Sequence, residues 1–365
     1  MGKVEYHYND SKRTEDLVLK RVFLYWLLEC KESTFISLIL FICVMRNGIG
    51  IHGATKTLLQ SEVNRNFDYS EYTSSPIFLP IKIVIHGNYF YWLVMNIFMI
   101  LLVLISFYIL ARNLFKNTHK FRLAVILFSL SPLVSVMFKT IGYYDPFFYL
   151  ATILGVLSRK KILIFIASIL LASTHSQAAC ISSLSLYLLL VCGPFKNFRN
   201  SKNAEFFAKC SFIMGSSISI FSYFFWRSER YTLIKPGLRD AIYSFFYSLP
   251  QHVYCSFGAL WLFIFVVLQK KWKWDKRSIS AIFISISLTG SVQLITNDGT
   301  RISLLILGAV IIVFIAMFSE NYFSYIVSQR HIVYAAFIMP AIVVQNIFIN
   351  PSYRQIVMLI DRLLN

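Results

Sequence analysis

Long apolar runs, separated by short polar or charged segments, occupy most of the chain. A transmembrane helix needs about 20 mostly apolar residues, and fewer where flanking Lys and Arg side chains reach the headgroups. We therefore expect an all-α fold, a polytopic bundle of about 11 transmembrane spans within a range of about 9–13. The spans are predicted near residues 34–45, 89–111, 123–138, 143–157, 162–173, 178–191, 211–226, 253–269, 279–295, 302–318 and 332–349.

These runs predict a single transmembrane domain at 34–349, between a cytoplasmic N-terminal segment (1–33) and a C-terminal tail (350–365). Residues 1–21 are polar and charged, unlike a cleaved signal peptide. Residues 17–28 suit an amphipathic interfacial helix or the start of a long first span. The runs at 162–173 and 178–191 are short for a full crossing, so tilted or re-entrant helices are alternatives there.

Composition supports the membrane interpretation. Only 14% of the residues are charged and 57% are hydrophobic, whereas a soluble domain carries about 25% charged residues. Six Cys residues occur, none in a CxxC pair and most in or beside apolar runs, so we read them as small hydrophobes. No Walker loop, GxSxG elbow, HExxH or EF-hand pattern is present. We therefore expect neither a metal nor another cofactor.

The formal net charge of +18 is largely a signal of orientation. With the N-terminus in the cytoplasm, roughly two thirds of the 35 Lys and Arg residues fall in cytoplasmic segments. The strongest markers are the clusters Arg159-Lys160-Lys161 and Lys270-Lys271-Trp272-Lys273. We accordingly predict a protein of the bacterial inner membrane whose partner is the lipid bilayer and not nucleic acid.

The remaining polar groups fall on the opposite, periplasmic side. Arg46 opens the long outer loop 46–88, which continues with Gly48, Gly50 and Gly53. Glycines let a backbone turn tightly and approach a ligand, and an Arg binds phosphate or carboxylate. The alternative is a flexible turn whose Arg lies among lipid headgroups.

Two further outer turns carry titratable side chains. Tyr143, Tyr144 and Asp145 precede Pro146 at the start of a span. Asp145 suits catalysis or a helix N-cap with Pro at the next position, and the tyrosines suit sugar stacking or an interfacial belt. His175 lies in a polar turn between two short apolar runs. It suits a general base, a phosphate-binding donor or an ordinary turn residue.

Basic residues also occur where the charge rule disfavours them. Arg227, Arg230 and Arg239 lie in the second large outer loop, 227–252, and suit an anionic ligand or headgroup contact. Arg301 heads an apolar helix, where a cation needs a partner or a bound anion. Asp298 is the nearest candidate partner, and the two residues suit either substrate binding or a local ion pair that caps the helix.

These motifs resemble the EpsG/Wzy-type polymerases of bacterial O-antigen and exopolysaccharide. The similar features are the Arg46-Asn-Gly-Ile-Gly loop, the Gly-Tyr-Tyr-Asp145-Pro turn, the His175 turn and Asp298-Gly-Thr-Arg301 before a late span. Where such proteins often carry an acidic residue after the first glycines, this chain has His52.

The resemblance implies transfer of a glycan from one undecaprenyl-pyrophosphate-linked repeat unit to another at the periplasmic face. It implies that Arg46, Arg301 and the arginines of loop 227–252 bind pyrophosphate, with His175 or Asp145 as general base. It also implies a chain-length regulator as a partner. The alternatives are a membrane glycosyltransferase of the GT-C kind, using a polyprenyl-phosphate sugar, and a flippase of lipid-linked oligosaccharides.

Overall fold

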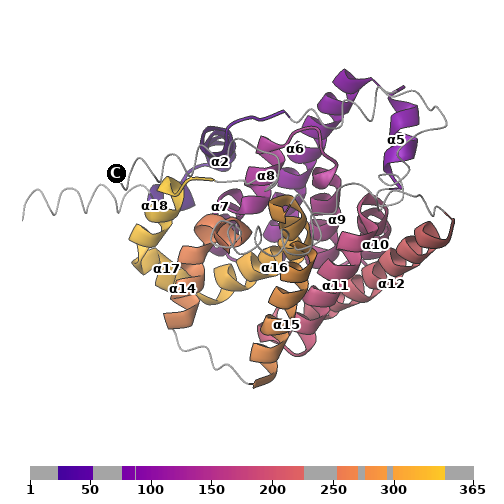
Figure 1. Ribbon diagram of the computed structural model, residues 1–365. Coiled ribbons are helices and arrows are strands. Elements are labelled where there is room, and N and C mark those ends of the chain that lie inside the picture. Colours follow the sequence, from indigo (N-terminus) through magenta and orange to yellow (C-terminus); the bar gives the residue numbers. More distant parts are fainter. Residues whose placement is uncertain are drawn as a thin grey trace, which may run out of the picture.

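The computed structural model describes residues 24–51, 76–86, 88–225, 253–269, 276–293 and 299–341, and these ranges are almost entirely helical (Figure 1). Within them no strand forms, apart from isolated bridges that join Ile51, Ile141 and Tyr143. The predicted all-α fold is therefore confirmed for this part of the chain.

Most predicted spans correspond to one helix or to two helices in succession. The first half of the chain contains α2 (Glu32–Asn47), α5 (Phe78–Val84), α6 (Tyr89–Leu114), α7 (Thr118–Ser129), α8 (Pro132–Lys139), α9 (Asp145–Leu157), α10 (Lys161–Thr174) and α11 (Ser176–Val191). The second half contains η1 (Pro194–Asn197), α12 (Ser201–Phe225), η3 (Gly258–Leu260), α14 (Trp261–Gln269), α15 (Lys276–Gln293), α16 (Gly299–Asn321), α17 (Phe323–Ser328) and α18 (Arg330–Ile338).

Three of these helices are long and apolar enough to cross a membrane: α6, the 201–221 part of α12, and α16. The pair α7 and α8 would be a fourth span, bent by 47° at its break. The other predicted spans correspond to shorter helices. The number of about eleven crossings therefore stays a prediction.

Helices α6 and α16 differ in how much of their apolar surface is buried. Every residue from 301 to 319 in α16 is buried, because the helix packs against α7, α9, α11 and α15 in the middle of the bundle. Helix α6 instead exposes an apolar stripe along its length, formed by Val94, Ile97, Phe98, Leu101, Ile105 and Ile109. A long exposed stripe of this kind is typical of a helix that faces lipid.

Several helix boundaries differ from the sequence prediction. The single span predicted at 123–138 is broken at Ser131–Pro132, because proline lacks the N–H that would continue the helix. Helix α12 begins at Ser201 and not at 211, since Ala204, Phe207 and Ala208 bury one face of its first turns. Helix α18 ends at Ile338, two residues before Pro340.

Polar contacts gather the connecting segments at two ends of the bundle. At one end, Glu32 contacts Arg112, Arg199 donates to the carbonyl of Leu114, and Lys120 donates to that of Glu320. All of these residues lie in segments predicted to be cytoplasmic. At the other end, the Trp92 indole, in the first turn of the span predicted at 89–111, donates to the carbonyl of Gly142, which lies in a segment predicted to be outer. The two groups are thus separated, while the side that each faces stays a prediction.

Candidate functional site

A buried ion pair lies at the start of two helices that are far apart in sequence. Nε of Arg301 is 3.6 Å from a carboxylate oxygen of Asp145, and Arg301 is 7% exposed while Asp145 is fully buried. Arg301 lies in the first turn of α16, where the helix dipole disfavours a cation. An anionic partner offsets that cost, and the structure supplies Asp145 in this role.

Asp145 is the first residue of α9, with Pro146 in the second position. The residue in the N-cap position is Tyr144, so Asp145 lies one position further into the helix than the predicted N-cap. The carboxylate nevertheless lies at the positive end of the α9 dipole, which stabilises the ionised form. Asp298, the partner predicted for Arg301, lies outside the described residues.

Two tyrosine rings adjoin the Arg301 guanidinium. Its central carbon lies 4.0 Å from the ring centroid of Tyr143 and 5.5 Å from that of Tyr144. Cation–π contacts of this length contribute about 2 kcal/mol where the cation is desolvated. Both tyrosines therefore contact Arg301, and their predicted stacking on sugar or place in the interfacial belt stays a prediction.

His175 joins this cluster through Tyr144, with 6.4 Å between the two ring centroids. It lies between α10 and α11, and its Nδ1 accepts a hydrogen bond of 3.3 Å from the backbone N–H of Ala178. Burial, and then the positive charge of Arg301, lower the pKa of the imidazole to about 4. The ring is therefore neutral at pH 7, and because Nδ1 accepts, Nε2 carries the proton.

Arg46 lies in a second cluster, where it contacts backbone rather than a carboxylate. Its guanidinium donates to the carbonyls of Leu130 (3.2 Å) and Met339 (3.3 Å), which follow α7 and α18. Carbonyls at helix C-termini lack helical partners and attract cations. Beside it, Lys139 donates to the carbonyl of Ala341. Sequence reasoning missed Lys139, although a lysine that ends an apolar run was a visible signal.

The glycines after Arg46 approach the protein's own backbone. Gly50 donates its N–H to the carbonyl of Phe138 and accepts from the N–H of Ile141, at 2.9 Å each. A Cβ built at Gly50 would lie 2.4 Å from the carbonyl oxygen of Lys139. The loop therefore closely approaches the segment 138–141, and its predicted approach to a ligand stays a prediction. This contact joins the Arg46 cluster to the chain that leads into Asp145.

The remaining predicted residues are not placed. Arg227, Arg230 and Arg239 lie in the stretch 226–252, outside the described residues. Across the described ranges, no group of three His, Cys, Asp or Glu side chains is arranged to hold a metal ion.

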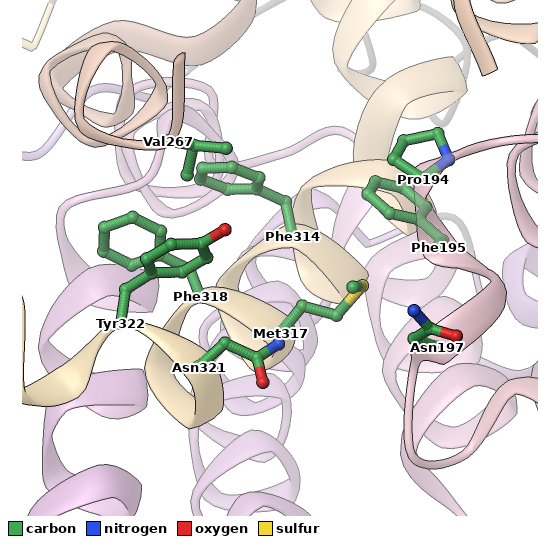
Figure 2. A pocket seen from close by; sticks show the side chains of 9 residues that line it. All are labelled: Pro194, Phe195, Asn197, Val267, Phe314, Met317, Phe318, Asn321 and Tyr322. Atoms are coloured by element: carbon green, nitrogen blue, oxygen red, sulfur yellow. The ribbon is translucent and has the colours of Figure 1, made fainter. Parts of the chain in front are cut away.

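A pocket of about 210 Å³ lies near the C-terminal end of α16, opposite the end that carries Arg301 (Figure 2). Its walls are mostly apolar and aromatic, with Phe314, Phe318 and Tyr322 on one side and Phe195 on the other. Asn197 and Asn321 contribute amide groups. The pocket brings no acid–base pair together, so the Arg301 cluster is the better candidate for chemistry.

The fold and the cluster together define a helical protein that has several helices long and apolar enough to span a membrane and an ion pair buried at one end of its central helix. No family model matches the chain, and neither the curated proteins nor the solved structures searched contain a match. The resemblance to polysaccharide polymerases therefore rests on the short motifs alone.

Proposed function

We propose that this chain is a glycosyltransferase of the inner membrane that polymerises a surface polysaccharide. It would transfer glycan from one undecaprenyl-pyrophosphate-linked repeat unit to another at the periplasmic face. The observation that carries the proposal is the buried cluster of Arg301, Asp145, Tyr143, Tyr144 and His175. Three of the four motifs on which the resemblance rests contribute to this cluster, although they are distant in sequence.

The chemistry suits a lipid-linked donor. In the proposed reaction, a hydroxyl of the acceptor sugar attacks the anomeric carbon of the donor, and undecaprenyl pyrophosphate leaves. Arg301 stabilises the charge that develops on the departing pyrophosphate. Asp145 accepts the hydroxyl proton, and the Nε2–H of His175 donates a hydrogen bond to a sugar or phosphate oxygen. The departing pyrophosphate supplies the driving force, so no nucleotide is required.

The distribution of charge favours this reading over a flippase. A transport path would require polar groups at mid-depth, and intramembrane charges mark such paths. Helix α16 carries no charged residue from 302 to 319, and its one buried cation, Arg301, is at the end of the helix. The GT-C-like transferase with a polyprenyl-phosphate sugar remains the second candidate, since the same cluster suits a monophosphate donor.

Replacement of Arg301 tests the proposal in cells that make the polysaccharide. We expect Arg301→Ala and Asp145→Asn to reduce the gel ladder of surface polysaccharide to single repeat units, with the protein still present by immunoblot. The matched control is Lys209→Ala, because Lys209 forms an exposed ion pair with Glu205 on α12. A normal ladder in Arg301→Ala would reject the proposal. Loss of one branch sugar with normal chain length would select the GT-C-like alternative.

A further inference from the structure

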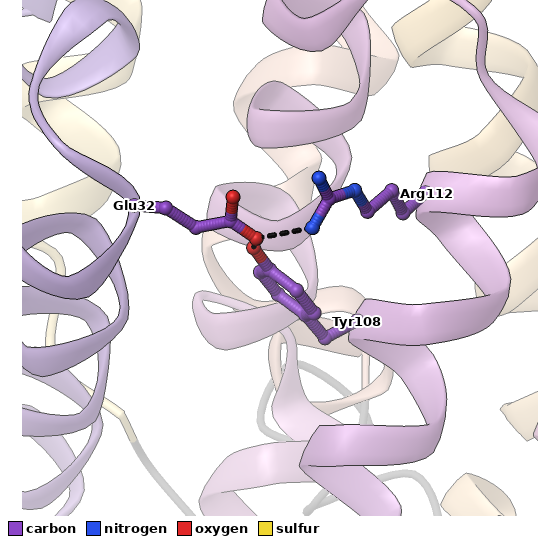
Figure 3. A network of polar contacts seen from close by, with 3 residues as sticks. All are labelled: Glu32, Tyr108 and Arg112. Atoms are coloured by element: carbon purple, nitrogen blue, oxygen red, sulfur yellow. Dashed lines mark hydrogen bonds and ion pairs between the residues drawn. The ribbon is translucent and has the colours of Figure 1, made fainter.

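A second pocket, of about 450 Å³, lies at the end of the bundle that gathers the basic segments. Glu32 of α2 borders it on one side, and Arg112, Asn113 and Lys116 border it at the end of α6. Arg122 of α7 completes the wall. Figure 3 shows the Glu32 carboxylate reaching across from α2 to the Tyr108 hydroxyl and the Arg112 guanidinium. This pocket is remote from the Arg301 cluster and independent of the function proposed for it.

The pocket holds three cations and one carboxylate. Arg122 is buried and has a structural role, since it donates to the carbonyl of Leu28 at 2.7 Å and lies 5.0 Å from the Phe35 ring centroid. Arg112 and Lys116 are exposed at the mouth. Glu32 neutralises only one of these charges, so the pocket has a net positive charge and attracts an anion.

Apolar stripes on both bordering helices lead to this charged mouth. On α6, Ile105 and Ile109 are about half exposed and lie on the same face as Arg112, one and two turns before it. On α2, Ile36 and Leu40 are exposed and follow Glu32 at helical spacing. A molecule bound here would place a charged group in the pocket and an apolar chain along the stripes.

We propose that this pocket binds the phosphate headgroup of an anionic phospholipid. A soluble anion would satisfy Arg112 and Lys116 but would leave the stripes unused, whereas a phospholipid matches both features. Basic pockets between transmembrane helices bind acidic headgroups on the cytoplasmic side. The orientation predicted from the Lys and Arg distribution places this end of the bundle on that side.

The test compares phosphatidylglycerol with phosphatidylcholine, each added to the purified full-length protein in detergent. We expect phosphatidylglycerol to raise the thermal unfolding midpoint and phosphatidylcholine to have little effect. A basic residue near an anionic lipid surface contributes enough to change affinity about fivefold. Arg112→Gln and Lys116→Gln should each weaken the apparent affinity for phosphatidylglycerol by about that factor.

Glu32→Gln provides the decisive variant, because it removes the one negative charge of the pocket. It should bind phosphatidylglycerol more tightly than the unmodified protein, a gain that a folding defect would not produce. Lys209→Gln, which removes a cation from the exposed pair on α12, is the control and should leave the affinity unchanged. Equal affinities in all four variants would overturn the proposal. An equal rise of the midpoint with glycerol phosphate alone would overturn the assignment to a lipid.

Discussion

Asp145 and Arg301 form an ion pair, 3.6 Å between carboxylate oxygen and Nε, in which both side chains are buried. Removing one charge leaves the other in an apolar setting. We expect Asp145→Asn to lower the free energy of unfolding by about 3–5 kcal/mol. Denaturant unfolding of the purified protein in detergent measures this loss.

The double variant Asp145→Leu with Arg301→Met separates stability from chemistry. Replacing both charges of a buried pair with apolar side chains is often neutral or stabilising. We expect the double variant to recover most of the stability lost by Asp145→Asn, while the polysaccharide ladder stays collapsed. A double variant with a normal ladder would show that the pair serves the fold alone.

The titration of His175 makes the stability of the folded protein depend on pH, and the direction of this dependence follows from the pKa. Its pKa is lowered from 6.5 to about 4, so between these values the unfolded chain binds a proton that the folded protein does not. The stability of the protein therefore falls as the pH is lowered from 6.5 towards 4. Unfolding midpoints across this range should show the fall in the unmodified protein.

His175→Asn is the matched variant for that measurement. The asparagine side-chain oxygen still accepts from the N–H of Ala178 and keeps the cap of α11, but the group no longer titrates. We expect this component of the pH dependence to disappear. An unchanged dependence would mean that other groups cause it.

Gly50 tests the close packing of the first outer loop. Because an added Cβ would lie 2.4 Å from the carbonyl oxygen of Lys139, Gly50→Ala forces the backbone apart and should cost about 1–3 kcal/mol. Gly308→Ala is the control, since its Cβ would meet the Tyr149 ring at an ordinary 3.5 Å. Alanine in the middle of α16 should gain up to about 1 kcal/mol. Equal unfolding midpoints for the two variants would contradict this geometry.

Replacement of Arg46 distinguishes a structural role from a contact with substrate. Its two hydrogen bonds to Leu130 and Met339 hold the ends of α7 and α18, so Arg46→Ala should lower stability by about 1–3 kcal/mol. If the structural role is the main one, the length of the polysaccharide ladder should fall in proportion to the amount of folded protein. Full stability with a collapsed ladder would instead assign Arg46 to substrate binding.

Orientation is testable by labelling with a membrane-impermeant maleimide, after the six native Cys are replaced. Thr118→Cys and Gln177→Cys place exposed thiols at opposite ends of the bundle. We expect the first to be labelled only in inverted vesicles and the second only in intact spheroplasts. The reverse pattern would invert the predicted topology, and with it the leaflet assigned to the lipid pocket.

The helices were largely predictable, because apolar runs and their polar boundaries are local features. The run that became α10 was predicted at 162–173, and the helix covers Lys161–Thr174. The prediction failed where local chemistry interrupts a run, as at Ser131–Pro132 in one predicted span. It also failed where an amphipathic start resembles a loop, as in α12. A search for long apolar runs does not detect such features.

The site was only partly predictable, for a different reason. A charge at the head of an apolar helix marks Arg301 as needing a partner, and the sequence shows this need. The identity of the partner depends on how α9 and α16 pack, which is a long-range property. The nearest acidic residue in sequence, Asp298, was therefore chosen as the partner, and the pairing of Arg301 with Asp145 was not predicted. Arg46 was likewise predicted to bind a ligand. Its backbone carbonyl partners could not be predicted, because every residue has a carbonyl and the sequence does not mark which ones lie nearby.

The burial of residues 301–319 of α16 determines when the bundle can be completed during synthesis. Its neighbours α7, α9 and α11 precede it in the chain by more than a hundred residues. Those helices are synthesised before α16 exists, so the surfaces that later contact α16 must stay uncovered or be covered by other groups until it arrives. The nascent chain reaches its final packing only after residue 321 has left the ribosome, and a chain cut short before α16 would lack its centre.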